Sequence, residues 1–409
     1  GIRDWPRDWS SDVCSSDLIT RKMKNTLLTG LMVLLGWGTA PLLHAAEPVP
    51  AEPIVLFRSG DAGSKYYRIP ALVTTTQGTL LAVADRRNDH HSDLPNRIDL
   101  VVRRSTDNGR SWGPQIVIAR HTEQTGYGDA AMVVDRSTGD ILCIYASGCG
   151  LWDSTAEHPL DINLSRSSDD GLTWSAPERI TPQIYGPGCD NPASAVISGA
   201  FAASGRALQL RDGTLLFAVA AHHTGKKWPP LYNYVCQSDD GGRSWRLLPT
   251  PASACGDESK LAELADGSWL ISIRNPDQGF RRYAVSKDRG RTWSDVAEWR
   301  DLPDPACNGD LLRYSLRSEG ASRDRLLHSI PADTARRRNV SVALSYDEGC
   351  TWPVRKSIWP DDSSYSALTR LADGSIGILW EAADGDNGQK ICFTRLTIDW
   401  LTDGADDGR

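Results

Sequence analysis

The chain has 409 residues and a formal net charge of −7 at neutral pH. Nucleic-acid-binding proteins usually carry a basic surface, so this charge argues against nucleic acid as a partner. Any anion that the protein binds must therefore meet a local cluster of basic side chains.

The first 46 residues are expected to lie outside the folded domain. Residues 1–22 are rich in Ser and Asp, precede a credible start at Met23, and are interpreted as a non-native upstream segment. Residues 23–46 have a basic start, an apolar run over 27–37 and small residues at their end, which is typical of a secretory signal peptide. The apolar run is too short for a comfortable membrane span. We therefore expect an exported protein, periplasmic or secreted, with no stable membrane span after processing.

Residues 47–409 are expected to form a single all-β domain. Apolar hairpins with a glycine turn recur along it, at residues 71–84, 132–146, 208–221, 261–274, 311–330 and 368–381. A third and a fourth strand follow each of the first five hairpins, and the sixth unit ends with a strand over residues 391–400. This repetition predicts a six-bladed β-propeller with four antiparallel strands per blade.

An eight-residue phrase, Ser-x-Asp-x-Gly-x-Ser/Thr-Trp, occurs five times. The copies begin at Ser105, Ser167, Ser238, Ser286 and Ser345. Asp and Ser side chains bond to nearby backbone groups, Gly takes a positive φ, and Trp reaches into the core. Each copy is therefore interpreted as a structural turn between strands three and four. The sixth unit lacks the phrase, which suits a last blade closed by an N-terminal strand over Ile54–Phe57.

Eight of the nine cysteines follow residue 46. Export permits disulfides, and Cys143 and Cys149 are close enough in sequence to pair across a loop; buried free thiols are the alternative. The cysteine spacing is not that of a zinc site, and the adjacent histidine pairs lack the spacing usual for metal ligands. We therefore expect neither a metal nor a cofactor.

Unusual polar residues gather where the hairpins begin and end. In an antiparallel blade, the start of strand one and the end of strand two share one edge, opposite the glycine turns and the Trp phrases. The residues at this edge are Arg68, Arg87, Asp93, Asp129, Glu258, Arg274, Arg337 and Tyr365. Each alone has an ordinary explanation, such as a surface ion pair or a strand cap. Inner strand ends converge on a propeller's axis, so the set as a whole predicts one binding site.

This set resembles the bacterial exo-α-sialidases (neuraminidases), six-bladed propellers with Asp-box (BNR) repeats. The resemblance covers about residues 53–400. It rests on Tyr-Arg-Ile-Pro at 67–70, the five Trp phrases, Asp-Arg-Arg at 85–87, Asp-Leu-Pro at 93–95, Asp-Glu at 257–258, Ser-Ile-Arg at 272–274 and Ser-Tyr-Ser at 364–366. It implies a hydrolase that releases terminal α-linked sialic acid from glycoproteins, gangliosides and oligosaccharides, in sialic acid catabolism.

The resemblance also implies how substrate is held. Arg68, Arg274 and Arg337 match the three arginines that bind the carboxylate of sialic acid, because guanidinium groups make paired hydrogen bonds to a carboxylate. We choose Arg337 over its arginine neighbours by its spacing to the fifth Trp phrase. Arg87 and Asp129 match polar contacts to the sugar.

The catalytic residues follow from the same match. Tyr365 corresponds to the nucleophile, Glu258 to its base, and Asp93 to the general acid. Two displacements imply retention of configuration. Transfer to another sugar, or intramolecular attack giving an anhydro product, would use the same residues and stays open. A non-catalytic glycan-binding propeller is a further alternative, although the three catalytic positions are filled.

Overall fold

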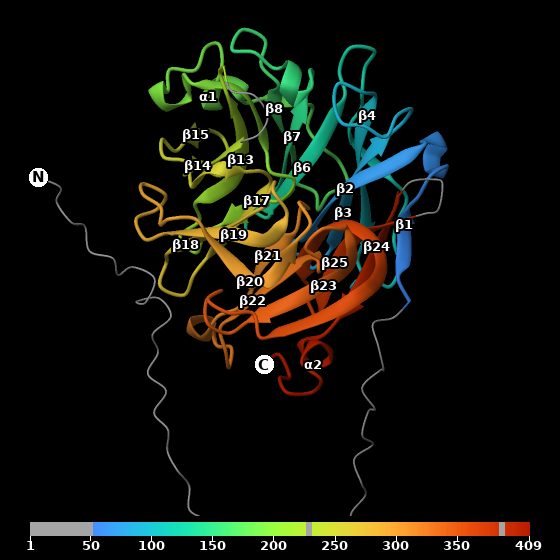
Figure 1. Ribbon diagram of the computed structural model, residues 1–409. Coiled ribbons are helices and arrows are strands. Elements are labelled where there is room, and N and C mark those ends of the chain that lie inside the picture. Colours follow the sequence, from blue (N-terminus) through green and yellow to red (C-terminus); the bar gives the residue numbers. More distant parts are fainter. Residues whose placement is uncertain (1–51, 226–230, 384–388) are drawn as a thin grey trace, which may run out of the picture. The chain divides into compact units, whose positions relative to one another are not determined.

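The computed structural model describes residues 52–225, 231–383 and 389–409 (Figure 1). The described residues all belong to one compact unit. The predicted upstream segment 1–22 and signal peptide 23–46 lie outside the described residues, so both stay predictions. No helix in the described part of the chain is long and apolar enough to cross a membrane.

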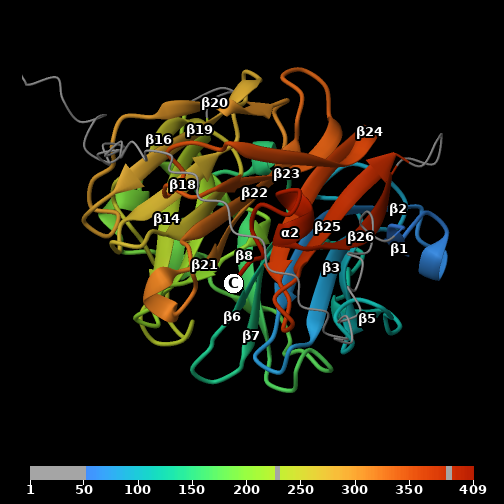
Figure 2. The same ribbon diagram turned by 90° about the horizontal axis from the view of Figure 1, so that it is seen from below.

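The strands form five sheets in an all-β, propeller-like arrangement (Figures 1 and 2). The first sheet contains β2 (Tyr66–Thr74), β3 (Leu80–Arg87), β4 (Ile98–Ser105) and β5 (Ile116–Ala119). The second contains β6 (Tyr127–Val134), β7 (Ile141–Ser147), β8 (Asp161–Ser167) and β9 (Glu178–Arg179), with β11 (Gly205–Arg206) beside β6. The third contains β10 (Ile197–Ala202), β12 (Leu208–Gln209), β13 (Leu215–His223), β14 (Leu231–Ser238), β15 (Arg246–Leu247) and β16 (Ser253–Gly256). The fourth contains β17 (Ser259–Glu263), β18 (Trp269–Ile273), β19 (Gly279–Ser286) and β20 (Ala297–Asp304).

The fifth sheet has seven strands. They are β21 (Asp310–Ser315), β22 (Arg325–Pro331), β23 (Arg338–Ser345), β24 (Val354–Arg370), β25 (Ile376–Ala383), β26 (Gln389–Leu396) and β1 (Ile54–Phe57). The long strand β24 pairs with β23 through Asp362 and with β25 from Ser363 onward. Strand β1 pairs with β26, which confirms the predicted closure by an N-terminal strand.

Helical turns are short. They are η1 (Asp61–Gly63), η2 (Leu151–Asp153), α1 (Thr181–Ile184), η3 (Pro192–Ser194), η4 (Arg317–Glu319) and α2 (Ile398–Leu401). Helix α2 corrects the predicted final strand of the sixth unit, which was expected over residues 391–400. Strand β26 ends at Leu396 rather than at residue 400, because the Thr397 side chain caps α2 by accepting a hydrogen bond from the Trp400 N–H.

The repeated Trp phrase forms the predicted turn in all five copies. Strands β4, β8, β14, β19 and β23 each end at its first Ser. In the first copy, the Ser111 N–H and hydroxyl donate to Asp107 (2.9 and 2.6 Å), and the Gly109 N–H donates to Ser105 Oγ (2.9 Å). The hydrogen bonds from Ser111 lower the pKa of Asp107 to about 2. All five glycines have φ between 78° and 84°, as predicted.

Two features of these turns were not predicted. The residue before each glycine also has a positive φ, between 57° and 71°. The Trp side chains are not equally buried: Trp245 and Trp352 are buried, whereas Trp112, Trp174 and Trp293 are half-buried. The tight turn is therefore held chiefly by its own hydrogen bonds, and the depth of the Trp depends on the neighbouring sheet.

The third hairpin differs from the prediction of a continuous pair over residues 208–221. Only Leu208 and Gln209 pair with β13 there, and the rest of β13 pairs with β10. Between them, β11 leaves the sheet and pairs in parallel with β6. The chain turns at Gly205, whose φ is 106°, and the next residue, Arg206, has its guanidinium Nε 3.2 Å from both carboxylate oxygens of Asp310 on β21.

Cys143 and Cys149 are both free thiols, so the proposed pair between them does not form. Cys143 is buried in the hydrophobic cluster between the first and second sheets, with Leu81, Val83 and Met132. The alternative of a buried thiol is therefore confirmed for Cys143.

Substituting Gly109 with Ala is expected to destabilise the fold through a clash in the first Trp turn. A Cβ at Gly109 would lie 2.2 Å from Cε1 of the buried Phe393. Gly60→Ala is the matched control, because Gly60 also has a positive φ (93°) and no described atom lies within 4 Å of its Cβ position. Urea denaturation should show Gly109→Ala to be less stable than Gly60→Ala by about 1–3 kcal/mol. Equal stabilities would contradict the packing of Phe393 against this turn.

Candidate functional site

The eight predicted site residues come from four of the five sheets. Arg68 lies in β2, Arg87 ends β3, Asp93 follows β3, Asp129 lies in β6, Glu258 precedes β17, Arg274 follows β18, Arg337 precedes β23 and Tyr365 lies in β24. Strand β2 contacts β6 and β24, and β21 contacts β17 and β24. These inner strands bring residues that are hundreds of positions apart in the chain to one place.

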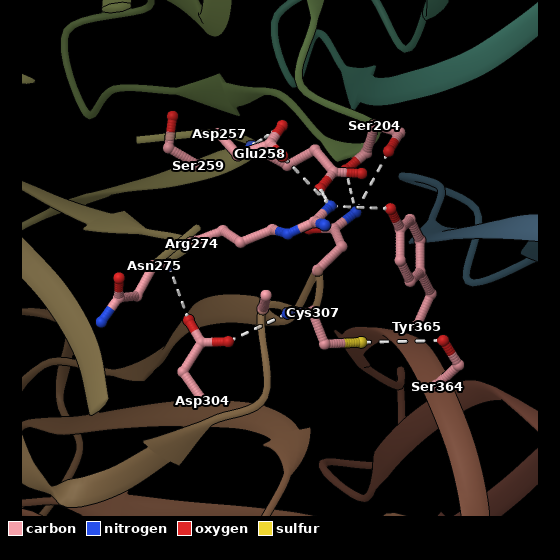
Figure 3. Close-up of polar contacts among 12 residues, drawn as sticks. Ser204, Asp257, Glu258, Ser259, Arg274, Asn275, Asp304, Cys307, Ser364 and Tyr365 are labelled. Atoms are coloured by element: carbon pink, nitrogen blue, oxygen red, sulfur yellow. Dashed lines mark hydrogen bonds and ion pairs between the residues drawn. The ribbon is translucent and has the colours of Figure 1, made fainter. Parts of the chain in front are cut away.

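Arg274 connects the acidic pair Asp257–Glu258 to Tyr365 (Figure 3). Its Nη1 donates to the Tyr365 hydroxyl (3.1 Å) and to Glu258 Oε2, and lies 3.4 Å from Asp257 Oδ2. The Glu258 carbonyl accepts from the Arg274 N–H (3.0 Å), which extends the β17–β18 ladder by one pair. The strand register therefore places the guanidinium beside the carboxylate.

Tyr365 and Glu258 are arranged as an acid and its base. Burial raises the pKa of Tyr365 well above its usual value, and the charge of Glu258 adds to this effect, although three nearby arginines oppose it. Burial also raises the pKa of Glu258, but the charge of Arg274 and a hydrogen bond from Tyr365 leave it below its usual value. The phenol is thus protonated and the carboxylate ionised at neutral pH, so Glu258 is ready to accept the phenolic proton.

The three predicted arginines lie close to one ring. The Cζ atoms of Arg68 and Arg337 lie 5.1 and 5.5 Å from the ring centroid of Tyr365, and Arg274 contacts its hydroxyl. Tyr365 itself packs against Ile69 and the buried thiol of Cys307. The structure therefore brings the three guanidinium groups and the phenol together.

The change of partner along β24 explains how Arg337 reaches this ring. The Ser363 N–H donates to the Arg337 carbonyl (3.1 Å) where β24 passes from β23 to β25, two residues before Tyr365. Arg337 Nη2 donates to the Ala306 carbonyl (2.7 Å). Arg336 and Arg338, by contrast, are exposed and pair with aspartates at the surface. The middle arginine of the three is the one that faces Tyr365.

Glu381, in β25, was not predicted as a site residue. It is completely buried and accepts from Arg68 Nε (2.9 Å) and Nη2 (3.1 Å), from the Ile69 N–H (2.8 Å) and from the Tyr365 N–H (3.2 Å). Burial lowers the pKa of Arg68, but the charge of Glu381 outweighs burial and keeps the pKa above its usual value. The available sequence signal was its position, because Glu381 is the last residue of its predicted hairpin (368–381), as Arg274 is of the hairpin over 261–274.

A second cluster is built around Arg87. This side chain is only 1% exposed, and it donates to Asp85 (3.1 Å), to Asp93 (2.6 Å) and to the His91 carbonyl (2.5 Å). Arg87 thus faces two carboxylates, and its predicted contact to the sugar stays a prediction. The Asp93 side chain is 71% exposed, so Arg87 anchors an otherwise open carboxylate.

Asp129 lies in the same cluster and has a positive φ of 61°. Its backbone N–H donates to Asp85 (3.1 Å). Burial raises the pKa of Asp129 well above its usual value, with further contributions from Asp85 and Asp93. Burial likewise raises the pKa of Asp85 to about 7, against the charge of Arg87. Glu258 also raises the pKa of Asp129, and Asp93 that of Arg68, so the two clusters lie within electrostatic reach.

Replacing the buried Glu381 with Gln is expected to lower the free energy of unfolding by about 3 kcal/mol, because it leaves the half-buried Arg68 without its carboxylate. Thermal and denaturant unfolding measure this loss. Glu319→Gln is the control, since Glu319 is an exposed residue of η4. A loss no greater than that of the control would show that Glu381 does not hold Arg68.

Comparison with known proteins gives concordant matches. A family model for the BNR repeat-like domain matches residues 78–378. A sialidase from Micromonospora viridifaciens is 35% identical over 381 residues, covering 88% of this chain and 56% of the relative. The chain thus spans little more than half of that relative's length.

Two solved structures agree with these matches. Hadza microbial sialidase Hz136 is 30% identical with a TM-score of 0.75, covering 85% of this chain and 69% of that one. The intramolecular trans-sialidase from Ruminococcus gnavus is 18% identical with a TM-score of 0.71, covering 85% of this chain and 97% of that one. The latter likeness concerns the fold alone.

Proposed function

Since this chain belongs to the sialidase family with a BNR repeat-like domain, we propose that it is an exo-α-sialidase that hydrolyses terminal α-linked sialic acid from sialylated glycans. The observation that carries this proposal is the phenol of Tyr365, which has Glu258 within hydrogen-bonding reach and three guanidinium groups close to it.

The three arginines suit a substrate with a carboxylate on its reacting carbon. Guanidinium groups form paired, charge-assisted hydrogen bonds to a carboxylate, and Arg68, Arg274 and Arg337 approach Tyr365 from different strands. We propose that they fix the substrate carboxylate next to the phenol. The anomeric carbon would then lie within reach of the Tyr365 oxygen.

The identity of the nucleophile follows from charge. A carboxylate nucleophile would be repelled by the carboxylate of the substrate, whereas a phenol approaches as a neutral group. In the first step, Glu258 takes the phenolic proton while the Tyr365 oxygen bonds to the anomeric carbon. Asp93 donates its proton to the departing glycosidic oxygen, and the aglycone leaves as an alcohol.

In the second step, Asp93 takes a proton from water, and the water oxygen displaces Tyr365 from the anomeric carbon. Glu258 returns its proton to the phenolate. Two displacements at one carbon give retention of configuration. Arg87 would hold Asp93 in position during both steps, and Asp129 would contribute a polar group beside it.

We also propose that the scaffold has six blades of four strands. The seven-stranded sheet counts as two blades that share β24, with β1 as the outer strand of the last. A hydrophobic cluster supports this count, because it joins Leu327, Val342 and Leu344 of one half of the sheet to Ile376 and Ile378 of the other. Neighbouring blades of a propeller pack face to face, and the two halves of this sheet pack against each other in this way.

The direct test is hydrolysis of 4-methylumbelliferyl α-sialoside by the purified protein. We expect release of the fluorophore, and proton NMR should show the α-anomer of free sialic acid as the first product. An absence of release from this substrate and from α2,3-, α2,6- and α2,8-linked oligosaccharides would contradict the proposal. If an anhydro sugar is the main product, or if sialic acid is transferred to added lactose, the proposed activity is the corresponding transfer reaction and not hydrolysis.

A further inference from the structure

A completely buried lysine lies behind the proposed base. Lys260, in β17, is 0% exposed, and its Nζ donates to Asn308 Oδ1 (2.7 Å) and to the Ser259 carbonyl (3.4 Å). Its chain lies against Gly205 of β11. Lys260 follows Glu258 by two residues, and the ladder continues to the Glu258 carbonyl, so both side chains lie on the same face of the strand.

Several charged or titratable groups from the surrounding elements act on Lys260 or respond to it. They are Glu258 before β17, Asp310 on β21, Arg206 on β11, Arg281 on β19 and His328 on β22. Arg206 pairs with Asp310 and Arg281 with Asp304, each at 3.2 Å. Burial lowers the pKa of His328 well below its usual value, so this ring is neutral.

Lys260 differs from these two arginines because its hydrogen-bond partners are an amide and a backbone carbonyl. An amide oxygen orients the ammonium group without cancelling its charge. The positive charge of Lys260 therefore remains available to act on the nearby carboxylates, Asp310 and Glu258.

We propose that Lys260 is a positioning residue for the proposed reaction, and that its buried ammonium group, oriented by Asn308, keeps Glu258 ionised when an anionic substrate binds. This inference rests on the proposed function. The carboxylate of the substrate would bring negative charge close to Glu258 and engage Arg274, which otherwise favours the ionised form of Glu258. Substrate cannot reach Lys260, because Lys260 is completely buried, so its charge stays available throughout turnover.

The protonation of Lys260 fits this role. Burial lowers the pKa of Lys260 to about 8, while Asp310 and Glu258 oppose the decrease. The ammonium form therefore predominates at neutral and acidic pH and is lost above pH 8. The Lys260 charge in turn acts to lower the pKa of Glu258, in the same direction as the larger contribution from Arg274.

The test compares pH profiles of kcat/KM for the unaltered protein and Lys260→Met. The acidic limb of this profile reports the base of the free enzyme. We expect Lys260→Met to shift this acidic limb towards higher pH by about one unit. The ratio of the two rates should then grow to about tenfold on the acidic side and shrink towards neutral pH.

Controls separate charge from packing. Lys260→Arg restores the charge and should return the limb towards its original position. Lys356→Met removes a lysine that pairs with Asp403 at the surface and should leave the limb unchanged. A folded Lys260→Met protein with an unshifted limb, or with an equal loss of rate at every pH, would overturn the proposal.

A measurement on the unaltered protein tests the proposal even if Lys260→Met does not fold or no hydrolysis is found. The carboxyl carbon of Glu258, assigned by ¹³C NMR with Glu258→Gln, should show an inflection near pH 8 as Lys260 loses its proton. A flat signal between pH 7 and 9 would overturn the role of Lys260 even if no sialoside were hydrolysed. Absent hydrolysis together with an inflection near pH 8 would instead contradict the proposed function and leave the coupling between Lys260 and Glu258 standing.

Discussion

Replacing Tyr365 with Phe is expected to reduce kcat/KM for an α-sialoside by at least about 10³-fold, because this change removes the proposed nucleophilic oxygen. The Tyr365 ring lies close to Arg68 and Arg337 and packs against Ile69 and Cys307, and Phe preserves these contacts. Substrate binding should consequently fall much less than turnover. Removal of the hydroxyl should also leave the fold intact, since Arg274 keeps its contact with Glu258.

Steady-state kinetics and calorimetric binding of a sialoside to the variant measure the two effects. Tyr283→Phe is the matched control, because Tyr283 lies in β19 and stacks on Trp299 outside the site. A Tyr365→Phe protein that keeps more than about a tenth of the original activity would remove Tyr365 from the nucleophile's role. Equal losses in both variants would indicate a general effect on packing.

Replacing Arg274 with Met is expected to reduce kcat/KM by about 10²–10³-fold and also to destabilise the protein. The first effect follows from the lost contact to the substrate carboxylate. The second follows because Asp257 and Glu258 would be left buried without their shared cation, which typically costs about 3–5 kcal/mol.

The destabilisation by Arg274→Met should depend on pH. Burial already raises the pKa of Asp257 to about 6, although Arg274 opposes this shift. Without Arg274 the folded-state pKa of Asp257 should rise further above its unfolded value. A carboxyl group whose pKa is higher in the folded state makes the folded protein less stable as pH rises from the unfolded-state to the folded-state pKa. The loss of stability caused by Arg274→Met should therefore be larger at pH 7.5 than at pH 5.

Urea denaturation at the two pH values measures this difference. Arg289→Met is the control, because Arg289 is a surface residue paired with Asp212 at 2.7 Å. An Arg274→Met deficit that does not change with pH would show that Asp257 and Glu258 do not depend on Arg274 for their charge.

The repeated turns could be predicted because their cause is local. Asp107 and Ser105 bond within the same eight residues, so the phrase itself determines where β4 ends. The path of the third unit could not be predicted in this way. Strand β11 pairs with β6 of the preceding sheet, and its Arg206 contacts Asp310, 104 positions further along the chain, so neither contact is local in sequence.

At the site, too, some features could be predicted from the sequence and others depend on contacts between distant residues. Arg68, Arg274 and Tyr365 were predicted because charged and phenolic groups at strand ends of one edge are unusual as a set. Lys260 was not predicted, since a lysine in a strand ordinarily extends to solvent and its burial depends on Asn308 and β11. The enclosure of Arg87 by Asp85 and Asp93 likewise results from the loop after β3 folding back over its side chain.

The continuity of strand β24 has a mechanical consequence for the site. One uninterrupted backbone belongs to two groups of strands, and the proposed nucleophile follows the crossover by only two residues. Any shear between those groups would have to bend the main chain beside the phenol. The position of the phenol is therefore tied to how the two groups of strands pack against each other.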